Sequence, residues 1–98
     1  MEITVTISRN VENWGGEDVD QPVVDAAAQL LADTIAAEIN DAYPEADVTA
    51  TTAETIDGQS LRTVRCTAAP DDETWETVTG YAARAEDLWE WALRTATV

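Results

Sequence analysis

Hydrophobic and polar residues alternate in three short stretches of the chain, at 2–8, 46–55 and about 59–68. A period of two residues is typical of a strand with one face in the core. In two longer stretches, about 21–43 and 71–96, hydrophobic residues recur at helical spacing. The order strand, helix, strand, strand, helix predicts an α+β two-layer sandwich, in which both helices cover one face of a three-stranded sheet.

The turn residues Asp57 and Gly58 join the last two strands into a predicted hairpin. A three-residue loop sets Ala50 opposite Val64 and unites the hydrophobic faces, whereas a two-residue loop would bury the charge of Arg65. We expect the third strand to insert between the other two, so that the sheet is antiparallel, as in a ferredoxin-like fold without its last strand. An order with the second strand in the centre is the alternative. In either order the uncovered face of the sheet is rich in threonine.

The segment 71–96 holds three of the four tryptophans, and we predict that it forms one long helix. Trp75 and Trp89 fall on the hydrophobic stripe of this helix, whereas Trp91 falls on the polar side and is available to a partner. The fourth tryptophan, Trp14, lies in a loop that also contains two glycines. We expect it to cover an open edge of the core.

The chain has 98 residues, of which 45% are hydrophobic, and we expect a single folded domain over residues 1–98. It has 20 acidic and 5 basic side chains, and its net charge is −15. A surface of this charge repels nucleic acids and anionic membranes, so the expected partner is a basic protein. The hydrophobic runs are too short to cross a membrane, and the first residues lack the pattern of a signal peptide. We therefore expect a cytoplasmic protein.

The chain contains no histidine and a single cysteine. Nucleophilic catalysis with a histidine base and the usual zinc sites are therefore excluded. Carboxylate pairs such as Asp71 and Asp72 remain, but adjacent side chains on a helix point about 100° apart. No stretch has the pattern of a calcium-binding loop. We expect no catalytic residues, no metal and no cofactor.

Acidic residues gather at one end of the predicted sheet, where the first helix ends, the second strand begins and the last helix starts. Carboxylates at the start of a helix cap free N–H groups, and either Asp71 or Asp72 is the expected N-cap. Glu38 and Asp41 have no such explanation, because they lie in the last turn of a helix, where the dipole disfavours anions. Arg65 is the only cation that we expect nearby. The predicted partner-binding residues are Glu38, Asp41, Glu45, Asp47, Asp71, Asp72, Glu73, Glu76 and Trp91.

Two functions fit this pattern. The first is a non-enzymatic nucleic-acid mimic, whose carboxylates occupy the DNA- or RNA-binding groove of a basic partner. In composition the chain resembles small, very acidic phage proteins that inhibit restriction or CRISPR complexes in this way, a similarity of class that no motif carries. The alternative is an ordinary α+β domain of a halophilic or GC-rich organism. Its acids would then serve hydration, and it could dimerise through the threonine-rich face of the sheet.

Overall fold

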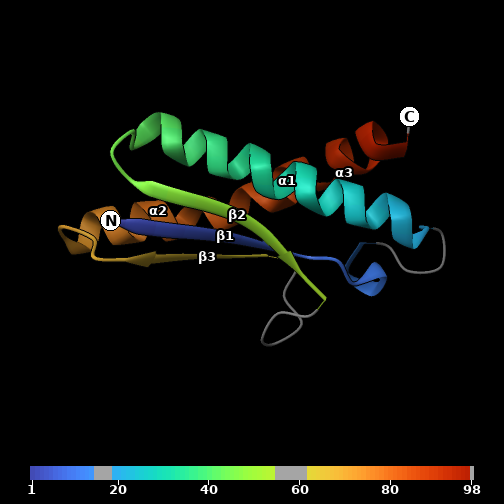
Figure 1. Ribbon diagram of the computed structural model, residues 1–98, viewed down its shortest axis with the longest axis horizontal. Helices are drawn as coiled ribbons and strands as arrows, with labels where there is room; N and C mark the ends of the chain where they lie inside the picture. Colours follow the sequence, from blue (N-terminus) through green and yellow to red (C-terminus); the bar gives the residue numbers. More distant parts are fainter. Residues whose placement is uncertain (15–18, 55–61, 98) are drawn as a thin grey trace.

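The protein forms two layers, a β-sheet and the helices that pack on one of its faces (Figure 1). The structure is a computed structural model, and it describes residues 1–14, 19–54 and 62–97. The predicted α+β sandwich and its order of strands and helices are confirmed. The elements are β1 (Glu2–Ser8), the 3-10 helix η1 (Val11–Trp14), α1 (Gln21–Ala42), β2 (Asp47–Ala53), β3 (Arg62–Thr67), α2 (Asp72–Gly80), the 3-10 turn η4 (Tyr81–Ala83) and α3 (Arg84–Thr97).

The sheet has the strand order β2-β1-β3, in which β1 runs parallel to β2 and antiparallel to β3. Our predictions of a fully antiparallel sheet, and of the third or the second strand in its centre, are therefore wrong. The 22-residue helix α1 provides the long crossover that two parallel neighbours need. Burial explains the central place of β1, because Ile3, Val5 and Ile7 are almost completely inaccessible to solvent. The edge strands carry mostly threonine, alanine and arginine.

The hydrophobic faces of the three strands nevertheless form continuous rows across the sheet. Val5 lies opposite Ala50 on one side and opposite Val64 on the other. The predicted pair of Ala50 and Val64 is therefore in one row, as expected, but a residue of β1 separates its members. The predicted turn at Asp57 and Gly58 lies outside the described residues. Sequence pattern alone thus identified the residues that share a face and misjudged which strands are neighbours.

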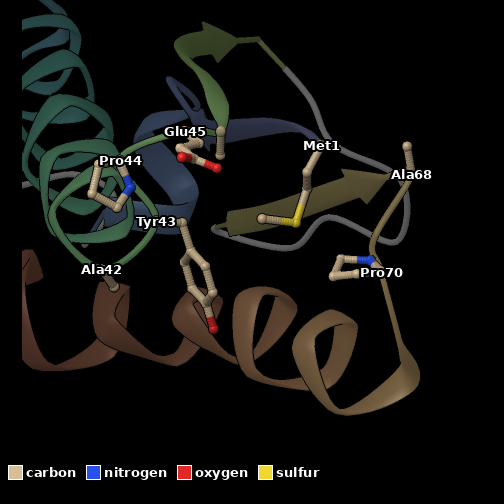
Figure 2. A pocket seen from close by; sticks show the side chains of 8 residues that line it. Met1, Ala42, Tyr43, Pro44, Glu45, Ala68 and Pro70 are labelled. Atoms are coloured by element: carbon tan, nitrogen blue, oxygen red, sulfur yellow. The ribbon is translucent and has the colours of Figure 1, made fainter.

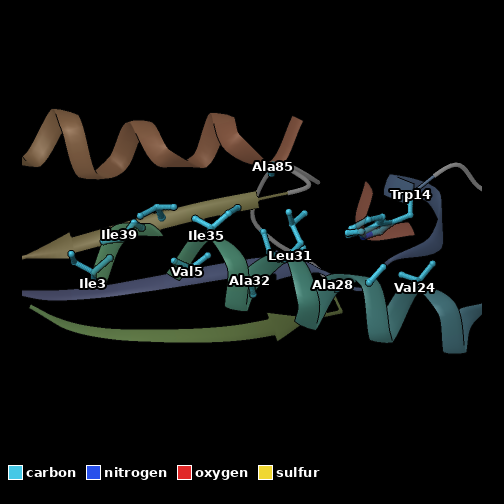
Figure 3. Packing of buried hydrophobic residues seen from close by; sticks show 14 of the residues in the cluster. Ile3, Val5, Trp14, Val24, Ala28, Leu31, Ala32, Ile35, Ile39 and Ala85 are labelled. Carbon is cyan, nitrogen blue, oxygen red and sulfur yellow. The ribbon is translucent and has the colours of Figure 1, made fainter. Parts of the chain in front are cut away.

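One face of α1 supplies most of the core on the helical side (Figure 3). The helix begins after the N-cap residue Asp20, and Pro22 lies in its first turn, where a missing N–H costs no hydrogen bond. Trp14 of η1 joins this core and is fully buried. The expectation that Trp14 covers the edge of the core is confirmed. The buried residues of α1 are Val24, Ala27, Ala28, Leu31, Ala32, Ile35 and Ile39.

The C-terminal segment is not one helix, because the turn η4 separates α2 from α3. Helix α2 packs against β3, whereas α3 packs against α1. A break at this place is reasonable because Gly80, the last residue of α2, is among the weakest helix formers. Projection onto a single straight helix placed Trp75 in the core, and this prediction is wrong, since the residue is 49% exposed. Val78 is the buried residue of α2.

At two positions near the ends of α2, the backbone conformation favours a different amino acid from the one present. Ala68, before α2, has a φ of 58°, a left-handed conformation that costs an L-residue about 1–2 kcal/mol. Gly80 has ordinary helical angles, and a Cβ added there would meet no atom within 4 Å. We expect Gly80→Ala to raise the free energy of unfolding by about 0.5–1 kcal/mol and Ala68→Gly by up to about 1 kcal/mol.

Urea denaturation of the two single variants and of the double variant measures these effects. The two sites are separated by a helix, so we expect the gains to add. A loss of stability in either single variant would contradict the assigned backbone conformation at that residue.

Candidate functional site

A hollow of about 590 Å³ lies at the end of the sheet where β1 begins (Figure 2). The sheet register brings its walls together, because Glu2 pairs with both Asp47 of β2 and Thr67 of β3. In addition, the Asp47 N–H donates a hydrogen bond of 3.0 Å to the Met1 carbonyl. We call this hollow the end groove. Its lining residues are Met1, Ala42, Tyr43, Pro44, Glu45, Ala46, Ala68 and Pro70.

The walls of the end groove are tight turns. The Tyr43 N–H donates to the Ile39 carbonyl at 2.8 Å and closes the last turn of α1. Pro44 follows, and the Ala46 N–H returns to the Tyr43 carbonyl at 3.0 Å. On the other side, the left-handed residue Ala68 redirects the chain from β3 toward Pro70 and α2. Both walls therefore have a backbone whose path is set by local hydrogen bonds or restricted dihedral angles.

Each segment that lines the end groove also carries exposed acidic residues beside it. They come from the start of β1, the end of α1, the start of β2 and the start of α2. The structure thus places beside the groove five of the eight acids that we expected at this end, from the end of the first helix, the start of the second strand and the start of the last helix. Glu73 and Glu76 lie further along α2. The structure adds one that we missed, Glu2, although the direction of the first strand would have placed it here. We call these residues the acidic end: Glu2, Asp41, Glu45, Asp47, Asp71 and Asp72.

Glu38 belongs to a different environment. Its carboxylate accepts two hydrogen bonds from Arg84, 2.9 Å from Nη2 to Oε1 and 3.2 Å from Nε to Oε2. Arg84 also lies 3.3 Å from Asp87. These bonds, above all those to Glu38, raise the pKa of the Arg84 guanidinium. The expectation that Arg65 is the only cation near the predicted acids is therefore wrong.

The turn η4 explains this ion pair. It lies between α2, which packs against β3, and α3, which packs along α1, so that the first residue of α3, Arg84, meets the last turns of α1. A cation at the start of one helix and an anion near the end of another are each unfavourable to their own helix dipole. Their mutual pairing offsets both costs. Glu38 therefore has a structural partner within the chain, and we do not count it in the acidic end.

The other described arginines lie away from the end groove or on another face. Arg65 is exposed on the uncovered face of the sheet, where it pairs in register with Thr4. Arg9 follows the far end of β1 and lines a separate hollow together with Asp25 and Glu54. The two ends of the sheet thus differ, because acids at the far end share a hollow with a cation. Among the described residues that line the end groove, none has a basic side chain.

Asp71 is the N-cap residue of α2, which confirms one of the two candidates, Asp71 and Asp72, that we predicted. Its Oδ1 atom accepts a hydrogen bond of 2.7 Å from the Thr74 N–H. Hydrogen bonding to Thr74, first of all from this backbone N–H, holds the pKa of Asp71 below its ordinary value of 3.8. A carboxylate with a lowered pKa in the folded state adds stability above the pKa of the unfolded chain, and this stability is lost as the pH falls through the folded-state pKa.

We therefore expect Asp71→Ala to lower the melting temperature at pH 7 and to approach the wild type in melting temperature at acidic pH. The quantity to compare at each pH is the difference in melting temperature between a variant and the wild type. Protonation of the many carboxylates that repel one another raises the melting temperature of all the proteins alike, and the difference removes this effect. Asp71→Asn keeps an acceptor for the Thr74 N–H but does not titrate, so its melting temperature should stay closer to the wild type at pH 7. Asp72→Ala removes a neighbouring charge outside the N-cap and is the control. An equal loss in Asp71→Ala and Asp72→Ala at pH 7 would contradict the role of the cap.

Two tryptophans are the exposed large hydrophobic residues in the described part of the chain. Trp91 of α3 is 38% exposed, which confirms the predicted exposure of this residue. Trp75 is more exposed and lies four residues after the cap Asp71, between Glu73 and Glu76 of α2. Aromatic residues of this kind often dominate binding energy at interfaces. Trp75 lies closer along the chain to the acidic end, and it was not among the predicted binding residues because its helical spacing indicated a core position.

The described residues contain no group of three or more histidine, cysteine or acidic side chains that could hold a metal ion. Nor does any helix within the described ranges have the length and hydrophobicity needed to cross a membrane. Comparisons with protein-family models, with curated proteins and with solved structures found no match to this chain. The acidic end, the end groove and the exposed tryptophans are the features of the described residues that could bind a partner.

Proposed function

We propose that this protein is a non-enzymatic nucleic-acid mimic that acts in the cytoplasm. In this proposal the acidic end occupies the DNA- or RNA-binding surface of a basic protein and so inhibits that protein. A restriction or CRISPR complex is the kind of partner that we propose. The observation that supports the proposal is the convergence of exposed carboxylates from four segments of the chain around one end of the sheet. Carboxylates gathered on one surface resemble a phosphate backbone in the sign of their charge, and complementary charge speeds and orients binding.

The position of these acids favours recognition over folding as their purpose. Asp41 lies in the last turn of α1, and Glu45 and Asp47 follow within six residues. The negative end of a helix dipole makes an acid in the last turn unfavourable by a few tenths of a kcal/mol. Stability alone would favour lysine or arginine at Asp41. Asp71 and Asp72, in contrast, are explained by the start of α2, and they contribute to the acidic end without arguing for it.

A second function has an observation in its favour. Exposed acids also occur on the outward face of α1, at Asp25 and Asp33, and on α3, at Glu86 and Glu90. Acids spread in this way suit a domain whose charge serves hydration, with the threonine-rich face of the sheet as a dimer contact. That function predicts a protein that needs high salt to fold, whereas the mimic should remain folded at about 0.1 M salt. Circular dichroism over a salt series separates the two.

Affinity capture tests the proposal directly. The immobilised protein is incubated with cytosol of the organism from which it comes, and bound proteins are eluted with a salt gradient. We expect a basic nucleic-acid-binding protein that elutes with a steep dependence on salt. Capture of only acidic or neutral proteins, or elution that is insensitive to salt, would count against mimicry.

A further inference from the structure

We propose that the end groove receives an arginine side chain of the basic partner. This inference rests on the proposed function and deepens it, because it names the group on the partner that the surface recognises. Charge mimicry alone needs only a convex array of anions. The end groove is an additional feature, a hollow of about 590 Å³ within that array.

The lining of the groove suits a long side chain with an uncharged stem. Met1 and Pro70 lie on one side of the hollow, and Tyr43 and Pro44 lie on the other (Figure 2). Seven of the eight lining side chains are uncharged, and the exception is Glu45. The stems of arginine and lysine bury well against such surfaces while the charged head reaches a polar rim.

The charges around the groove select a cation as its occupant. Glu45 lines the groove itself, and its carboxylate lies at the edge in Figure 2. The lining segments continue directly into the other members of the acidic end, at Glu2, Asp41, Asp47 and Asp71. An anionic side chain would be repelled by these carboxylates, and a purely hydrophobic side chain would gain no charge partner at the rim. A cation gains several carboxylates at once.

The combination of aromatic, proline and carboxylate groups favours arginine over lysine. A guanidinium is planar and weakly hydrated, stacks on ring faces and pairs with a carboxylate through two hydrogen bonds. An ammonium is a strongly hydrated point charge and keeps more of its water. Tyr43 supplies the ring and Glu45 the carboxylate within one groove. Arginine is also among the residues with which proteins contact phosphates, so it belongs to the surface that a mimic must cover.

Two peptide probes test the inference, an acetylated hexa-arginine amide and the matching hexa-lysine amide. Calorimetry at about 0.15 M salt should show that the wild-type protein binds the arginine peptide about two- to five-fold more tightly. Amide chemical shifts on adding the arginine peptide should change most at residues 42, 43, 45, 46, 68 and 69. Equal affinity for both peptides, or largest shifts elsewhere, would overturn the inference.

Filling the groove without a change of charge gives a sharper test. Ala42 is exposed at the end of α1 and lines the groove, so Ala42→Leu should fill part of it and leave the fold intact. We expect this variant to bind both peptides with the affinity that the wild type has for hexa-lysine. Ala26→Leu makes the same change at an exposed position near the start of α1 and should keep the preference for arginine. A preference retained in Ala42→Leu would refute the groove as its source.

These results are distinct from a failure of the proposed function. If the groove does not select arginine, both peptides still bind through charge, and capture of the basic partner is unaffected. If the proposed function is wrong, no basic nucleic-acid-binding partner is captured, whatever the peptides show.

Discussion

Replacing Trp14 with alanine is expected to lower the free energy of unfolding by about 3–5 kcal/mol. The side chain is 0% exposed, and it is the largest fully buried residue of the core. Its Nε1 atom donates a hydrogen bond of 2.6 Å to the Ser8 carbonyl at the end of β1. Alanine removes both the packing and the donor. A domain of this size has a total stability of about 5–15 kcal/mol, so the substitution should remove a large fraction of it.

Urea denaturation followed by circular dichroism measures this loss. Trp14→Phe keeps a large ring but removes the N–H that the Ser8 carbonyl accepts, and we expect a loss of about 1–3 kcal/mol. Trp91→Ala makes the same truncation at an exposed position and should cost about 1 kcal/mol or less. If Trp14→Ala were as mild as Trp91→Ala, Trp14 could not be the buried residue that joins η1 to the core.

Reversing two charges of the acidic end should abolish binding to the basic partner and leave the fold intact. Asp41→Lys with Glu45→Lys replaces anions beside the end groove by cations, and we expect the affinity to fall at least about 100-fold. The same change should slightly stabilise the protein, by about 0.3–1 kcal/mol, because lysine in the last turn suits the dipole of α1. Calorimetry with the captured partner and thermal melting measure the two effects.

The matched control is Asp25→Lys with Asp33→Lys, which makes the same change of net charge at two exposed positions of α1 away from the acidic end. Asp25 and Asp33 accept hydrogen bonds from Gln21 and Gln29 along the outward face of α1. We expect this variant to keep most of the affinity and to bind more slowly, since long-range charge acts mainly on association. Equal losses in both variants would show that net charge, and not the acidic end, drives binding.

For the sheet, the sequence pattern predicted the strands and their hydrophobic faces but not the order of the strands. The alternation of residues identified every strand and the hydrophobic face of each, so that Val5, Ala50 and Val64 fall in one row. It did not determine which strands are neighbours, because Ala50 and Val64 belong to this row whether they pair directly or through β1. Comparison of the strands holds a further signal. Only the first has β-branched residues at all its inward positions from Ile3 to Ile7, and the centre of a sheet buries such a strand best.

Helical projection of the C-terminal part was correct for most of the stripe and wrong at its first residue. Val78 and Ala85 are buried, and Trp89 and Leu93 pack against the core, on both sides of the 3-10 turn η4. Trp75, in the second turn of α2, is exposed, and the ion pair between Arg84 and Glu38 was not predicted. Gly80 was the available signal for a break. The partner of Arg84 was not predictable, because it depends on the angle between α1 and α3.

Most residues of the acidic end could be predicted from the sequence, whereas the groove beside them could not. Strand and helix directions alone place Asp41, Asp47 and Asp71 at one end of the sheet. The groove, in contrast, is formed by Met1, Tyr43 and Pro70, which are far apart in sequence and have no shared pattern. Such a hollow depends on the distances between the start of β1 and the turns that follow α1 and β3. Sequence periodicity contains no information on these distances.

Competition with nucleic acid tests the central claim most directly. The captured partner is incubated with a labelled DNA or RNA that it binds, and this protein is added in increasing amounts while fluorescence anisotropy reports the bound fraction. Mimicry predicts that nucleic acid is displaced completely, at concentrations that rise with the concentration of nucleic acid, and that Asp41→Lys with Glu45→Lys displaces none. A complex in which the partner holds both this protein and nucleic acid at once would contradict the account.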